Sequence, residues 1–136
     1  FGCVWHLNLH SMPQNAYERL GIKTDKPLAD FVLGDRDGTT CEPEFVNLVD
    51  KSLRASGYTV ARNDPYKGVA LLEQMGQPAL KRHSLQIEIN RALYMNEARF
   101  ERHDGFDRLA RDLGTLVAAL DDGLRLTLYP PKETAK

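Results

Sequence analysis

Apolar and polar residues alternate in two segments of the chain, and strict alternation is typical of a strand with one buried face. Residues 83–90 read HSLQIEIN, so Leu85, Ile87 and Ile89 fall on one face and the polar residues on the other. Residues 2–9 (GCVWHLNL) show the same period, with the tryptophan and both leucines opposite the histidine and the asparagine. We therefore expect two strands, each with a face that can be buried and a face that can carry chemistry.

Shorter apolar runs predict two more strands, FVLG at residues 31–34 and YTVAR at residues 58–62. After Pro43 the apolar residues recur at helical spacing, and Gly57 is a suitable residue to end that helix. A second long amphipathic helix is predicted from Phe106. Strands that alternate with helices favour an α/β fold, in which helices are layered on a sheet.

The remaining segments predict connections and one short helix. GVALLEQMG, at residues 68–76, favours a short helix, whereas residues 11–30 contain prolines and a glycine and predict a long loop. The tail from Pro130 is polar, and we expect it to fray. With 136 residues, the chain is long enough for one domain with a hydrophobic core.

The composition excludes several classes of protein. Hydrophobic residues make up 42% of the chain and charged residues 27%, as in soluble globular proteins. The formal net charge of -1 gives no field of one sign, so we expect no nucleic-acid partner and no membrane partner. No apolar run approaches the roughly 20 residues of a membrane span, and no signal peptide is recognisable. Because the two cysteines form no CxxC pair, we expect a cytoplasmic protein without a disulfide framework.

Polar side chains follow all four predicted strands. In open α/β sheets, ligands bind outside the carboxyl ends of the strands, so these side chains are candidates for a site. They are His10 after the first strand, Arg36 after the second, Tyr66 after the third, and Glu88 and Arg91 at the end of the fourth. We expect the four strand ends to meet at one edge of the sheet.

His10 and Tyr66 each have two interpretations. His10 can be a metal ligand or a general base, or it can be a histidine at a strand end that is bonded to the backbone. His6 lies on the same face about 13 Å away at the rise of a strand, so the two histidines cannot share one metal ion. Tyr66 could also be an exposed residue of a surface loop that takes no part in a site.

The charged candidates also have structural alternatives. Glu88 is flanked by apolar residues, so we expect it to be partly buried. It is then either the partner of an arginine such as Arg91 or a carboxyl group of raised pKa that transfers protons. Arg36 has the planar fork that suits a carboxylate, but Asp35 or Asp37 could simply neutralise it.

Four segments, in this order, resemble one known family. WHLNLHSMP, FVLGDRDGTTC, NDPYKG and LQIEINRALYMNE are similar to segments of the N-formylglutamate amidohydrolase (deformylase) family, and the likeness runs from about Val4 to the last helix. The resemblance implies a zinc-dependent hydrolase of phosphorylase/hydrolase-like fold, related to carboxypeptidase A and succinylglutamate desuccinylase. It implies that N-formylglutamate, a small acidic N-acyl amino acid, is hydrolysed to formate and glutamate in histidine catabolism.

The resemblance also implies roles for individual residues. His10 matches a zinc ligand at a strand end, and Glu88 matches the glutamate that acts as general base. Tyr66 lies in the loop where carboxypeptidase-like enzymes carry a mobile tyrosine. Arg36 and Arg91 are expected to bind the substrate carboxylates, because arginine meets a carboxylate with two parallel hydrogen bonds.

The paired metal-ligand motif of the family's first half does not occur in this chain. Catalytic zinc usually takes three protein ligands, so His10 alone cannot hold it. We therefore expect residues 1–136 to be either a single domain or the C-terminal half of one larger hydrolase domain, with the missing N-terminal half as its partner. Two alternatives stay open: an amidase for another N-acyl amino acid or a peptide, and a half-domain without catalytic activity.

Overall fold

The sheet at the centre of the fold is mixed. In the computed structural model, which describes residues 2–128, four strands lie in the order β1-β4-β2-β3. They are β1 (Val4–Met12), β4 (Arg82–Asn90), β2 (Phe31–Gly34) and β3 (Val60–Arg62). β1 runs parallel to β4, and β3 runs parallel to β2, but β2 runs antiparallel to β4.

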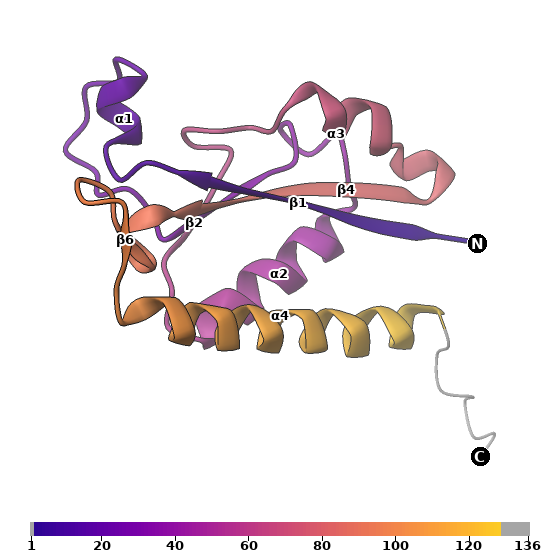
Figure 1. The fold of residues 1–136 in the computed structure, drawn as a ribbon. Helices are drawn as coiled ribbons and strands as arrows, with labels where there is room; N and C mark the ends of the chain where they lie inside the picture. The colour runs from indigo at the N-terminus through magenta and orange to yellow at the C-terminus, as the bar shows by residue number, and fades with distance from the viewer. Residues whose placement is uncertain (1, 129–136) are drawn as a thin grey trace.

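Two long helices cover one face of the sheet, and shorter segments lie on the other side (Figure 1). The long helices are α2 (Pro43–Ala55) and α4 (Gly105–Leu128), and the short ones are α1 (Ala16–Arg19) and α3 (Ala70–Met75). The 3-10 helices η1 (Pro78–Leu80) and η2 (Arg91–Leu93) flank β4, and the hairpin of β5 (Met95–Asn96) and β6 (Glu101–Arg102) precedes α4. The layered α/β fold class is confirmed.

Within residues 2–128, no helix combines the length and the hydropathy needed to cross a membrane.

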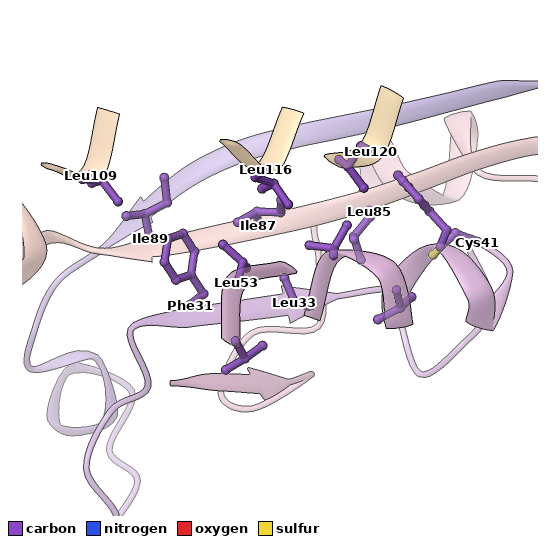
Figure 2. Packing of buried hydrophobic residues seen from close by; sticks show 14 residues of the cluster. Phe31, Leu33, Cys41, Leu53, Leu85, Ile87, Ile89, Leu109, Leu116 and Leu120 are labelled. Carbon is purple, nitrogen blue, oxygen red and sulfur yellow. The ribbon is translucent and has the colours of Figure 1, made fainter. Parts of the chain in front are cut away.

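The hydrophobic core lies between the sheet and the pair of long helices (Figure 2). β4 is central, and every residue after Arg82 in this strand is buried. Its apolar residues face those of α4 across the core: Leu85, Ile87 and Ile89 from the strand, and Leu109, Leu116 and Leu120 from the helix. Because neighbouring residues of a strand point to opposite faces, the polar residues of β4 turn away from this core.

The ends of α2 follow from two residues that the sequence singles out. Pro43 occupies the first turn, where its missing N–H is not needed and its fixed φ suits a helix. Gly57 follows the C-cap residue Ser56 and has a φ of 93°, which glycine adopts without a steric penalty. The predicted start and end of this helix are confirmed.

Several elements differ from the sequence prediction. β1 extends to Met12 instead of ending at residue 9, because it stays in register with β4 as far as the pair Met12–Asn90. β3 begins at Val60, two residues later than predicted. The predicted loop over residues 11–30 contains the short helix α1, and the β5–β6 hairpin was not predicted. The tail from Pro130 lies outside the described residues.

The expectation that four strand ends meet at one edge of the sheet is wrong. Because β2 and β3 run antiparallel to β4, their carboxyl ends lie toward the opposite edge from those of β1 and β4. Val32 pairs with Glu88 and Gly34 pairs with Gln86, so the chain after β2 moves away from Glu88. Gly34 already lies opposite a residue two positions from Glu88 on β4, and the chain then forms a turn at residues 36–39, so Arg36 follows β2 at the end away from Glu88.

Candidate active site

The polar faces of β1 and β4 form one continuous surface. The parallel register places three pairs side by side, namely His6 with Ser84, Asn8 with Gln86, and His10 with Glu88. Hydrogen bonds cross this surface, including Asn8 Nδ2 to Gln86 Oε1 at 3.3 Å and a 2.9 Å bond between His6 Nδ1 and Ser84 Oγ. The same alternation that builds the core on one face therefore assembles a polar network on the other.

His10 and Glu88 lie side by side on this surface, near the carboxyl ends of β1 and β4. His10 Nδ1 lies 3.7 Å from Glu88 Oε1, and Gln86 Nε2 donates a 2.9 Å hydrogen bond to the same oxygen. The Glu88 side chain is only 8% exposed, whereas the His10 side chain is 39% exposed. Asn8 Nδ2 lies 3.1 Å from His10 Nε2. An amide nitrogen only donates, so Nε2 accepts this bond and Nδ1 faces the carboxylate. The expected burial of Glu88 is confirmed.

The electrostatics of Glu88 suit a group that exchanges protons. Burial raises the pKa of the Glu88 carboxyl group, because the charged form loses its hydration. Electrostatic interactions with His10 and Arg91 lower the same pKa and partly offset the burial. A carboxyl group whose pKa is moved toward neutrality is a more effective general base near neutral pH than an exposed one.

Tyr66 is brought to this pair by the loop that follows β3. The backbone N–H of Val69 donates to Gln86 Oε1 at 3.1 Å, so the loop lies over the polar face of the sheet. Burial and the negative charge of Glu88 raise the pKa of the Tyr66 hydroxyl, and the charges of Arg19 and Arg91 lower it. Tyr66 is thus close enough to these charged groups for each to act on it.

Arg91 lies at the carboxyl end of β4 and connects it to β1. Its Nε donates to Ser11 Oγ at 3.1 Å, and its Nη1 lies 3.4 Å from Glu97 Oε1. The direct partners of Arg91 are therefore Ser11 and Glu97. Arg91 lowers the pKa of Glu88 through its charge, without a hydrogen bond or ion pair between the two residues. Four of the predicted residues, His10, Tyr66, Glu88 and Arg91, are brought together at this end of the sheet.

Arg36 is the predicted site residue that the fold places elsewhere. Its Nη2 forms a 2.7 Å ion pair with Glu73, and its Nη1 donates to the carbonyl of Gly68 at 2.8 Å. Its backbone N–H donates to Lys67 O at 2.8 Å. Arg36 therefore anchors the loop that carries Tyr66.

Neither aspartate expected to neutralise Arg36 does so. Asp37 pairs with Lys67 at 2.8 Å, and Asp35 accepts from the side-chain amide of Asn63 and from the N–H of Gly38, each at 2.8 Å. The acidic partner of Arg36 is instead Glu73, which comes from α3. The structural alternative, an arginine neutralised within the protein, therefore holds with a carboxylate other than the two that were considered.

We expect Arg36→Ala to lower the free energy of unfolding by about 1–2 kcal/mol, mainly through the lost bond to the Gly68 carbonyl. The Glu73 side chain is 58% exposed, so its ion pair with Arg36 is screened by water and contributes less. Urea denaturation measures the change. Lys67→Ala is the matched control, because it removes an ion pair whose partners are both more than half exposed and should have little effect. Equal stability of wild type and Arg36→Ala would show that Arg36 does not anchor the loop.

Sequence reasoning missed Arg19. This arginine is the last residue of α1, and its charge acts on the same tyrosine hydroxyl as that of Glu88. The only signal in the sequence is a basic residue shortly after the strand that carries His10, inside a segment that predicts a loop.

The described residues do not by themselves make a complete metal site. Among residues 2–128, no group of three or more histidine, cysteine, aspartate or glutamate side chains is placed to hold a metal ion. His10 could supply one ligand through Nε2 in place of the bond from Asn8, since its ring is partly exposed and its Nδ1 is held toward a carboxylate, as is common for metal-binding histidines. A catalytic zinc ion usually takes three protein ligands, so further ligands would be needed.

Comparison with known proteins decides the family. The pattern that defines the N-formylglutamate amidohydrolase family matches residues 1–95, a range that includes His10, Tyr66, Glu88 and Arg91. The chain belongs to this family. The resemblance of the four sequence segments is thereby confirmed.

Individual relatives of the N-formylglutamate amidohydrolase family agree with this assignment. The chain is 65% identical to an N-formylglutamate amidohydrolase of known crystal structure from Ralstonia eutropha JMP134, with a TM-score of 0.84 over 90% of this chain and 45% of that one. It is 34% identical over 74 residues to the N-formylglutamate deformylase of Pseudomonas putida, and 32% identical over 74 residues to that of Pseudomonas aeruginosa. These matches cover 54% of this chain and 28% of each deformylase. The chain therefore spans less than half the length of these relatives.

Proposed function

We propose that the complete polypeptide carrying this chain hydrolyses the amide bond of N-formylglutamate to formate and glutamate. The observation that carries the proposal is the pair of His10 and Glu88, held 3.7 Å apart on the polar face of a sheet that belongs to the N-formylglutamate amidohydrolase family. A place in histidine catabolism in the cytoplasm is part of the same proposal and rests on the substrate.

Glu88 is the proposed general base. Its raised pKa favours acceptance of a proton from the attacking water and its later delivery to the leaving amine. Gln86 fixes the carboxylate by the hydrogen bond to Oε1. Tyr66, whose raised pKa keeps its hydroxyl protonated at neutral pH, can donate a hydrogen bond to the oxygen that becomes negative as the carbonyl is attacked.

His10 is the proposed ligand of a zinc ion. Bound zinc supplies Lewis-acid activation of the formyl carbonyl and of a water molecule. His10 presents its ring at the carboxyl end of β1, beside the base and within one network of hydrogen bonds. The other ligands would come from the length of the relatives that this chain does not span.

A substrate panel tests the proposed function. We expect formate release from N-formylglutamate by the complete polypeptide, with lower kcat/KM for N-formylglutamine, N-acetylglutamate and a formylated dipeptide. A higher kcat/KM for one of the other N-acyl compounds would replace the proposed substrate and leave an amidase of different specificity. Failure to hydrolyse any of these compounds with zinc present would contradict the proposal that the protein is an amidohydrolase and would favour a non-catalytic role.

A further inference from the structure

The arginines near the candidate site differ in which nitrogens are already bonded. Arg36 uses both terminal nitrogens, Nη1 for Gly68 and Nη2 for Glu73. Arg91 uses Nε for Ser11 and Nη1 for Glu97. Arg19 uses only Nε, which donates to Asn15 Oδ1 at 2.9 Å. Of these three arginines, only Arg19 has both terminal nitrogens without a protein partner in the part of the chain that the structure describes.

The bond to Asn15 matters because it orients the guanidinium group. Asn15 and Arg19 lie four residues apart at the two ends of α1, so a short helix holds the donor and the acceptor together. Two parallel N–H groups of a planar guanidinium match the two oxygens of a carboxylate. With Nε held by Asn15, the pair Nη1 and Nη2 is ordered and available for such a carboxylate.

Arg19 lines an open cavity beside the candidate site. The cavity has a volume of about 630 Å³, and its wall includes Gln14, Asn15, Arg19, Asn96 and Glu97. This volume is within the range of small-molecule sites. It adjoins the segments that follow β1 and β4, and the charges of Arg19 and Glu88 act on the same Tyr66 hydroxyl. Because the wall comes from the segments directly after these two strand ends, the cavity can take the far end of a substrate whose amide lies at Glu88.

Glu97, the acidic residue in the wall of this cavity, is bonded to groups other than Arg19. Glu97 Oε1 lies 3.4 Å from Arg91 Nη1, and Glu97 Oε2 accepts from the backbone N–H of Gln14 at 2.9 Å. Neither carboxylate oxygen of Glu97 contacts Arg19 in the part of the chain that the structure describes. The terminal nitrogens of Arg19 are therefore available to bind a negatively charged ligand.

We infer that Arg19 binds the side-chain carboxylate of the substrate and thereby selects acidic N-acyl amino acids. The inference rests on the proposed function for the reaction, but it assigns the recognition of the substrate's second carboxylate to a residue outside the pair that performs the chemistry. It also replaces Arg36, whose two terminal nitrogens are occupied, in the role expected from the sequence.

The test compares two substrates that differ in one group. N-formylglutamate and N-formylglutamine have nearly the same size, but the second lacks the side-chain carboxylate. Arg19→Gln in the complete polypeptide is expected to raise KM for N-formylglutamate roughly 10- to 150-fold, the loss expected for a charged hydrogen bond, with little change in kcat. KM for N-formylglutamine should hardly change. Arg19→Lys should restore part of the loss, because it keeps the charge but not the fork.

The matched control is Arg82→Gln. Arg82 is an exposed arginine at the start of β4, the opposite end of the strand from the candidate site. This variant should leave the kinetics with both substrates as in wild type. An equal loss for both substrates in Arg19→Gln, or no loss for either, would overturn the assignment of Arg19.

A binding measurement separates the inference from the proposed function. If the wild-type protein does not hydrolyse N-formylglutamate, the proposed function fails, and calorimetric titration with glutamate and glutamine still tests Arg19. The inference expects wild type to bind glutamate more tightly than glutamine and Arg19→Gln to lose this preference. Equal affinities in wild type, or an unchanged preference in the variant, would overturn it.

Discussion

Glu88→Gln is expected to lower turnover of N-formylglutamate by a factor on the order of 10²–10⁴, the usual contribution of a general base. The substitution keeps the size of the side chain and its capacity to accept from Gln86, but an amide cannot take a proton at neutral pH. The loss should appear in kcat, since the variant changes proton transfer more than substrate binding. Steady-state kinetics with N-formylglutamate measure it.

Stability and a control variant distinguish this role from a structural one. The melting temperature and the zinc content of Glu88→Gln should stay close to those of wild type. Glu42→Gln makes the same chemical change at a half-exposed carboxylate beside His83, away from the site, and should keep its activity. Retained turnover in Glu88→Gln together with a large drop in melting temperature would mean that Glu88 stabilises the fold instead of moving protons.

His10→Ala is expected to abolish stoichiometric zinc binding and activity together. Loss of a partner that merely orients a ligand weakens metal binding 10- to 100-fold, and loss of a ligand itself should weaken it by more than about 100-fold. Elemental analysis of the purified complete polypeptide gives the zinc stoichiometry. His10 is partly exposed, so its removal should leave only a small effect on folding.

His6→Ala is the natural comparison for His10→Ala. His6 lies on the same face of the same strand, roughly 13 Å away at the rise of a strand, and is bonded to Ser84. The His6→Ala variant should retain zinc and activity. If His10→Ala keeps the zinc content of wild type, His10 is not a ligand. A loss of zinc in His6→Ala instead would place the metal nearer the start of β1.

The residues predicted well were those whose signal is local. The alternation around Leu85, Ile87 and Ile89 defines which face of β4 is buried, and the same alternation places Glu88 on the opposite face. Pro43 and Gly57 bound α2 through their own backbone preferences. In each case the physical cause lies within a few residues of the effect, so a single sequence contains it.

The residues predicted poorly depend on partners far along the chain. FVLG has the same apolar pattern whether it pairs parallel or antiparallel, so the direction of β2, and with it the location of Arg36, could not be deduced from residues 31–34. The guanidinium of Arg36 indicated a carboxylate partner, but the sequence does not show that this partner is Glu73 on α3. Arg19 was missed because α1 has only four residues, too few for a helical period to be visible.

The polar network on β4 has a consequence for the two oxygens of the Glu88 carboxylate. Gln86 Nε2 and His10 Nδ1 both approach Oε1, and Gln86 cannot turn its amide around, since its Oε1 already accepts from Val69 N and Asn8 Nδ2. Among the residues that the structure describes, Oε2 has no such donor. The two oxygens are therefore chemically inequivalent before any substrate arrives: Oε1 fixes the carboxylate in place, and Oε2 is the oxygen left available for the proton transfer that we propose for Glu88.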